Sequence, residues 1–98
     1  MATFIVLFNW TEQGIKGYKD SPNRVNQASE AWQDLGVSIK DIYWTIGPYD
    51  LVGIVDAPGP EALASALLSL GAAGNVRTTS MRALDRAEAE AVIARAAG

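Results

Sequence analysis

The 98-residue chain contains neither cysteine nor histidine. Without cysteine, disulfides, thiolate nucleophiles and cysteine-ligated zinc or iron–sulfur centres are excluded. Without histidine, the chain lacks the usual general base, the nucleophile pairs that depend on it, and imidazole ligands for a metal or haem. A metal ion would need hard oxygen ligands, and no Asp-x-Asp-x-Asp-Gly loop is present to supply them. We therefore expect no metal and no cofactor.

Charged residues are also scarce. They make up 19% of the chain, below the usual share of about a quarter, while hydrophobic residues make up 49%. A composition this apolar predicts that part of the outer surface is buried as well, and a homodimer or higher homo-oligomer is the simplest way to bury it. The net charge of −3 argues against a nucleic acid or an anionic membrane as partner, because both need a basic face.

Long apolar runs are missing too. The longest stretch without a charge, 62–76, contains serine, glycine and asparagine, and it is shorter than the roughly 20 apolar residues of a membrane-spanning helix. Residues 1–10 are apolar, but they carry neither the basic region nor the small-residue cleavage site of a secretion signal. We therefore expect a cytoplasmic protein in which residues 1–98 form a single domain.

The pattern of apolar residues and turn formers predicts the order of the elements. The apolar run 3–9 predicts a buried strand, and a helix follows with Ser21 as its cap, Pro22 as its first residue and Gly36 as its end. This order of strand, helix, strand, strand, helix, strand predicts an α+β, ferredoxin-like βαββαβ fold, with a four-stranded antiparallel sheet, two helices on one face and a further C-terminal helix. The remaining predicted segments are strands over 37–46, 50–57 and 75–84 and helices that begin at Pro60 and after Asp85.

The first strand predicts that both faces of the sheet are covered. It has apolar residues at both parities, namely Phe4, Val6 and Phe8 on one side and Ile5 and Leu7 on the other. Successive side chains of a strand point to opposite faces, so neither face is expected to meet water. The most direct cover for the second face is the sheet of another subunit, and the alternative is the C-terminal helix.

Four motifs occur in a fixed order along the chain: Asn9-Trp10-Thr11-x-x-Gly14-Ile15-Lys16, Lys19-Asp20-Ser21-Pro22-x-Arg24, Tyr43-Trp44-Thr45-x-Gly47-x-Tyr49-Asp50 and Gly74-Asn75-Val76-Arg77-Thr78. Together they resemble the GYD family of small bacterial and archaeal proteins, which is named for a Gly-x-Tyr-Asp element. Gly47, Tyr49 and Asp50 match that element here. The resemblance implies a ferredoxin-like subunit that pairs as a dimeric α+β barrel. That superfamily includes cofactor-free monooxygenases, small-ring isomerases, haem-dependent members and ligand-binding modules, so the resemblance implies no particular reaction.

Five polar residues on the predicted strands are candidates for a ligand site: Asn9, Tyr43, Thr45, Arg77 and Thr79. Parity places Tyr43 with Thr45 on one face, and Arg77 with Thr79. If these side chains point into the barrel, an amide, a phenol, hydroxyls and a guanidinium meet in an apolar cavity. Such a site suits a small apolar molecule with an anionic or carbonyl end. Alternatively, Arg77 and Tyr43 bind each other or bridge the dimer interface.

A hairpin with a tight turn at Gly47-Pro48 is expected to join the second and third strands. Tyr49 and Asp50 at this turn are candidates, with Tyr43, for proton transfer in a catalytic site, Asp50 orienting Tyr49. The alternative is structural: Asp50 accepts hydrogen bonds from turn amides, and Tyr49 packs on a neighbour.

These features favour an oligomeric small-molecule-binding module with its ligand in the barrel. One alternative is a cofactor-independent oxygenase, isomerase or cyclase, in which Tyr43 or Tyr49 handles a proton and Arg77 stabilises an enolate-like charge. The other is a purely structural oligomer with a filled barrel. The missing histidine disfavours the enzyme, since tyrosine and aspartate need strongly shifted pKa values to act near neutral pH.

Overall fold

The computed structural model describes the whole chain, residues 1–98. Its strands are β1 (Ala2–Trp10), β2 (Ser38–Trp44), β3 (Leu51–Ala57) and β4 (Val76–Ala83). Its helices are α1 (Glu12–Lys16), α2 (Ser21–Trp32), α3 (Pro60–Ala72) and α4 (Arg86–Ala97), with 3-10 turns over Tyr18–Asp20 and Gln33–Leu35. None of the helices has the length and apolar content to cross a membrane.

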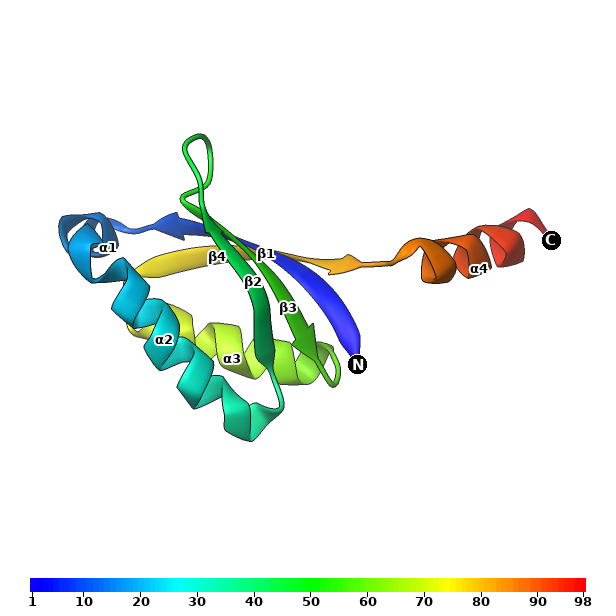
Figure 1. The fold of residues 1–98 in the computed structure, drawn as a ribbon, viewed down its shortest axis with the longest axis horizontal. Coiled ribbons are helices and arrows are strands. Elements are labelled where there is room, and N and C mark those ends of the chain that lie inside the picture. Colours follow the sequence, from blue (N-terminus) through cyan, green and yellow to red (C-terminus); the bar gives the residue numbers. More distant parts are fainter.

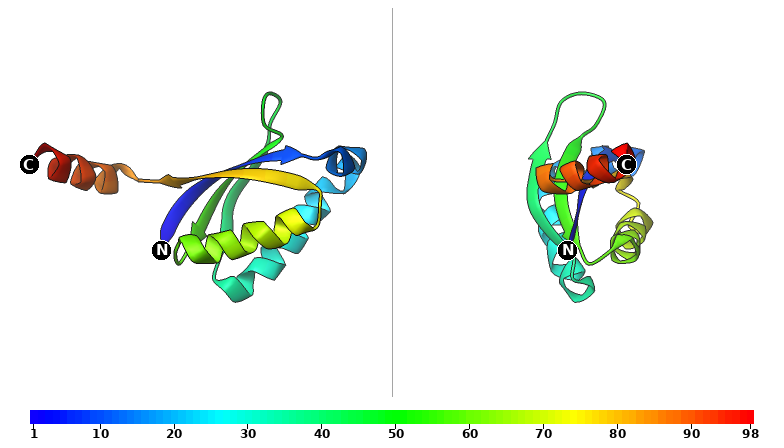
Figure 2. Two further views of the ribbon diagram at one scale, coloured as in Figure 1. Left: turned by 180° about the vertical axis from the view of Figure 1, so that it is seen from behind. Right: turned by 90° about the vertical axis from the view of Figure 1, so that its right-hand side faces the viewer.

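The four strands form one antiparallel sheet in the order β2-β3-β1-β4. The first strand lies in the middle and pairs with β3 on one side and β4 on the other. Helices α2 and α3 cover one face of the sheet, and no element of the chain covers the other (Figures 1 and 2). This arrangement confirms the predicted α+β, ferredoxin-like fold.

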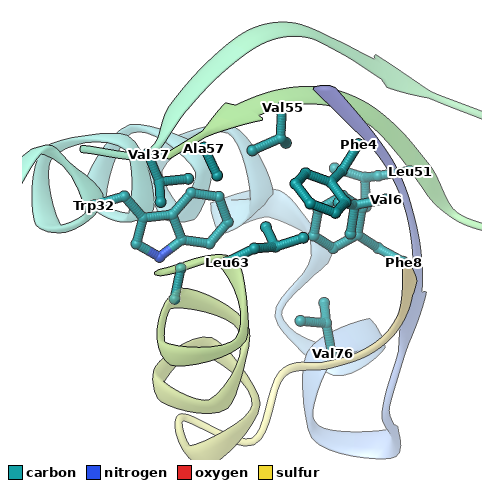
Figure 3. Packing of buried hydrophobic residues seen from close by; sticks show 11 residues of the cluster. Phe4, Val6, Phe8, Trp32, Val37, Leu51, Val55, Ala57, Leu63 and Val76 are labelled. Atoms are coloured by element: carbon teal, nitrogen blue, oxygen red, sulfur yellow. The ribbon is translucent and has the colours of Figure 1, made fainter. Parts of the chain in front are cut away.

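The core lies between the sheet and the two helices. Phe4, Val6 and Phe8 of β1 point into it, and Trp32 of α2 and Leu63 of α3 meet them from the other side (Figure 3). The even residues of β1 are buried because the strand alternates, so its odd residues lie on the uncovered face. The layer of helices on one face therefore covers most of the apolar residues of β1 but leaves Ile5 and Leu7 on the uncovered face.

Two local expectations are wrong. Asp20 precedes the first residue of α2, and the Ser21 side chain does not cap the helix but accepts a 2.9 Å hydrogen bond from the Trp44 indole N–H. The turn between β2 and β3 is not tight: residues 45–50 form a loop that projects from the sheet, closed at its base by a 2.9 Å bond from the Thr45 N–H to the Asp50 carbonyl (Figure 1).

The last helix projects from the end of β4 and packs on neither the sheet nor α2 or α3 (Figures 1 and 2). A capping box defines its start, because Asp85 and Glu88 each accept a backbone N–H from the other. Glu88 also binds Arg82 of β4 at 2.8 Å, which links the helix to the strand. The alternative in which α4 covers the second face of its own sheet is therefore wrong.

Glycine at position 14 allows a close approach of two backbone segments. A Cβ at this position would lie 1.9 Å from the Asn75 carbonyl oxygen, which already accepts a 3.0 Å hydrogen bond from the Thr11 N–H. This contact joins the end of β1 to the start of β4 through backbone atoms, which cannot move aside as a side chain can. Gly14 thus fixes where α1 sits.

We predict that Gly14→Ala lowers the free energy of unfolding by roughly 1–3 kcal/mol, the usual range for forcing an extra methyl group into a packed site. Urea denaturation followed by circular dichroism measures the change. Gly71→Ala is the matched control, because its Cβ would meet nothing closer than 3.8 Å and alanine favours a helix. Equal stability of Gly14→Ala and the wild type would show that the Asn75 backbone moves freely.

Candidate functional site

The uncovered face of the sheet is apolar at its centre. We call it the open face, and its apolar side chains come from three adjacent strands: Ile5, Leu7, Val52, Ile54 and Met81. They are register neighbours, since Ile5 lies opposite both Ile54 and Met81. Met81 is 45% exposed, and the other four are half-buried only by one another and by their strands. A contiguous apolar surface of this kind marks an interaction site.

Polar groups lie at one end of the open face. Thr3 donates a 2.8 Å hydrogen bond to Asp56, and the Lys40 ammonium lies 3.6 Å from the same carboxylate. These three residues come from β1, β3 and β2, so they satisfy one another across the sheet. Charge therefore lies at the rim: the Lys40–Asp56 pair at one end, and Asp41 opposite Ile54 on the edge strand β2.

The predicted ligand residues of the first and last strands have partners within the chain. Asn9 and Arg77 lie opposite each other in the register. The Asn9 amide donates a 2.7 Å bond to the Pro48 carbonyl, and Arg77 donates 3.2 Å bonds to the carbonyls of Gly71 and Val76. Both side chains thus donate hydrogen bonds to backbone carbonyls, and Arg77 does not bind Tyr43.

The other predicted ligand residues are spread across the sheet. Thr79 lies on the open face of β4 opposite Leu7, whereas Tyr43 lies on β2, the opposite edge strand, and is 58% exposed. Thr45 lies in the projecting loop, where its hydroxyl donates a 2.6 Å bond to the Tyr49 carbonyl. One copy of the chain therefore places Asn9, Arg77 and Thr79 at neighbouring positions of β1 and β4, with the Asn9 and Arg77 side chains bound to different segments, and it holds Tyr43 and Thr45 apart from them.

The Gly-x-Tyr-Asp element fastens the projecting loop to β1. The Asp50 carboxylate accepts a 2.8 Å hydrogen bond from the Trp10 N–H, and the Asp50 N–H donates a 2.8 Å bond to the Phe8 carbonyl. Tyr49 is half-buried beside it. Since the carboxylate of Asp50 accepts a backbone N–H of β1, it has a positioning role at the base of the loop, and proton transfer by Tyr43 or Tyr49 stays a prediction.

A cleft on the helix side of the sheet was not predicted from the sequence. It lies between α2, α3 and the floor of the sheet, and its polar lining includes Ser21, Arg24 and Asn75. Arg24 donates to the carbonyls of Gly14 and Gly17 at 3.2 and 2.8 Å. The helical spacing of the apolar residues on α2 gave the only sequence signal, and that signal cannot distinguish a filled core from a cleft.

The root of α4 carries the one clearly shifted carboxyl group. The Asp85 backbone N–H, followed by the Arg82 guanidinium, lowers the pKa of Glu88 below its ordinary value. Glu88 therefore keeps its negative charge to a lower pH than an ordinary glutamate does. The orientation of α4 relative to β4 rests on this exposed set of bonds.

We predict that Asp50→Ala lowers the free energy of unfolding by about 1.5–3 kcal/mol, because it removes a charged acceptor from the Trp10 N–H. The amide of Trp10 should also exchange faster, which hydrogen exchange measured by NMR detects. Asp41→Ala, an exposed carboxylate on β2, is the control. If the two variants behave alike, Asp50 does not fasten the loop.

Sequence comparison supplies a family and a relative. The GYD domain model matches residues 4–93 of the chain. The chain is also 35% identical to a Thermus thermophilus protein named "Glutamine synthetase and cystathionine beta-lyase binding protein", over 90% of this chain and 94% of that protein.

Solved structures support the fold. A second Thermus thermophilus match, a crystal structure, has 29% identity and a TM-score of 0.54 over 87% of this chain and 95% of its own. A feast or famine regulatory protein of M. tuberculosis complexed with L-methionine has 21% identity and a TM-score of 0.66, and the Mycobacterium tuberculosis leucine response regulatory protein has 21% and 0.65. This chain spans about half, 51%, of each of these two regulators, and they show the fold alone. With the family model matching nearly its whole length, the chain belongs to the GYD domain family.

Proposed function

We propose that this protein is a homo-oligomeric binding module, most simply a homodimer in which the open faces of two sheets pack together as a dimeric α+β barrel. The observation that carries the proposal is the open face itself. Its centre is apolar, its charges lie at the rim, and no element of its own chain covers it. Two such faces stack at about 10 Å with their side chains interdigitated, which removes both from water.

The projecting helix supports the same assembly. A 12-residue helix that packs on no other element and is linked to its chain only through Arg82 is marginal in water, because its nucleation cost is not offset by packing. Ala89, Val92, Ile93 and Ala96 follow the spacing of one helix face, and Val92 and Ile93 are 51% and 65% exposed. The α4 stripe, as we call these four residues, packs in our proposal on the second copy.

Within the barrel, a small apolar molecule with an anionic or carbonyl end is part of the proposal. Thr79 and Tyr43 are the polar side chains of the open face whose hydroxyl groups bind nothing else in the chain. Two-fold pairing doubles this set, so that groups held apart in one copy have equivalents on the other. Asn9 and Arg77 contribute less, since both already serve backbone carbonyls.

A second candidate function is the binding of another protein. The relative named for binding glutamine synthetase and cystathionine beta-lyase matches almost the whole chain. The projecting loop offers a suitable contact, because Ile46 at its tip is fully exposed while its base is fixed by Asp50 and Asn9. A fixed apolar tip loses little conformational entropy on docking. We propose that the dimer presents this loop to a metabolic enzyme.

We predict that the wild-type protein runs at twice the chain mass or more in native mass spectrometry, and that Leu7→Lys converts it to a folded monomer. A lysine at the centre of the open face would be buried without a partner. A small molecule lost on denaturation would identify a barrel ligand. Ile46→Lys, on the loop tip, is the control and leaves the oligomeric state unchanged. A monomeric wild type would overturn the homodimer.

We predict that glutamine synthetase from the same organism binds the wild-type protein in surface plasmon resonance, and that Ile46→Asp weakens binding at least tenfold. Burying an isoleucine contributes about 1.5–3 kcal/mol, which corresponds to a factor of ten or more. Leu68→Asp, an exposed position on α3, is the matched control. Equal binding by both variants would show that Ile46 does not contact glutamine synthetase.

A further inference from the structure

The cleft on the helix side is large for so small a chain. Helices α2 and α3 both rest on the sheet but pack only loosely against each other, and between them a cavity of about 220 Å³ reaches down to β1 and β3. Figure 2 shows the two helices on the same side of the sheet, away from the open face. An apolar cavity of about 150 Å³ holds benzene in another protein, so this one has room for a two-ring molecule.

The lining of the cleft is mostly hydrophobic. Twelve of its 17 residues are apolar, and aromatic rings come from both the sheet and α2, which favours a flat ligand over a branched one. The residues that form its floor and walls include Phe8, Trp10, Trp32, Leu51, Leu70 and Val76. Trp32, at 3% exposed, is fixed by the core, so this wall is already in place without a ligand.

Two polar residues of the cleft lining have donor groups without an acceptor in the chain. Ser21 is 4% exposed, and its oxygen accepts the Trp44 indole N–H, but its own proton has no acceptor in the chain. The Asn75 side-chain oxygen accepts from Gln13 at 3.0 Å, which leaves the amide N–H groups of Asn75 without a partner. Arg24 also lines the cleft, where it donates to the Gly14 carbonyl and lies 3.9 Å from the Asp20 carboxylate, which balances its charge.

We propose that this cleft binds a flat, two-ring aromatic molecule with one carboxylate or carbonyl group. The rings lie among the tryptophans and leucines, and the acceptor oxygen meets the Ser21 hydroxyl, with the Asn75 amide as a second donor in the lining. A buried donor without a partner is unfavourable, and an acceptor on the ligand removes that cost. The site lies on the opposite face of the sheet from the proposed dimer contact, so the proposal goes beyond the function given above.

The test titrates full-length protein with 2-naphthoate and, separately, with naphthalene, following quenching of tryptophan fluorescence. We expect saturable binding of 2-naphthoate by the wild type, and binding at least tenfold weaker in Ala28→Phe, whose ring occupies the cleft from α2. Ser21→Ala should weaken 2-naphthoate at least threefold and leave naphthalene unchanged. NMR shifts of the amides of Val25, Ala28 and Leu70 provide a measurement that does not depend on any variant.

Thr79→Phe, on the open face, distinguishes the cleft from the barrel. If binding survives Ala28→Phe but is lost in Thr79→Phe or in Leu7→Lys, the ligand lies between the sheets and the cleft proposal is wrong. Failure of the wild type to bind 2-naphthoate saturably also overturns it. If Ala28→Phe does not fold, Ala31→Phe fills the same cleft from an exposed position. The oligomeric state is measured in the same samples, so loss of the dimer and loss of cleft binding are separate results.

Discussion

The antiparallel pairing of β1 with both β3 and β4 is the interaction on which the rest of the structure depends. Because β1 is central, its even residues form the middle of the core and its odd residues form the middle of the open face. The helices cover only the first of these surfaces. The fold of one chain therefore leaves an apolar sheet surface that needs cover from elsewhere, and this imbalance leads directly to the proposed homodimer.

The end of β1 also organises the loop and the cleft. Phe8 and Trp10 bind Asp50 through their backbones, while their side chains lie in the cleft on the helix side. Residues 8–10 thus contact the Gly-x-Tyr-Asp element through their backbone and line the cleft with the side chains of Phe8 and Trp10. The carboxylate of this motif holds β1 in place through the Trp10 N–H, and its part in proton transfer stays a prediction.

Features set by neighbouring residues could be predicted from the sequence. The strand at 3–9, the left-handed Gly36 that ends the 3-10 turn after α2, and the capping box of α4 all follow from local chemistry. Features set by distant residues could not. Ser21 resembles a cap, but Trp44 lies above it only after the sheet has formed. The cleft depends on how far α2 and α3 separate, which no local pattern records.

The projecting α4 has a consequence for how this chain responds to its surroundings. The α4 stripe is covered by nothing in its own chain, so the helix gains its packing energy only from another molecule. Its helical content is therefore linked by mass action to the concentration of that molecule, whereas the core between the sheet and its two covering helices is built within one chain. In the proposed homodimer, the helical content of the C-terminus therefore rises with the concentration of the protein, while the core of each copy stays unchanged.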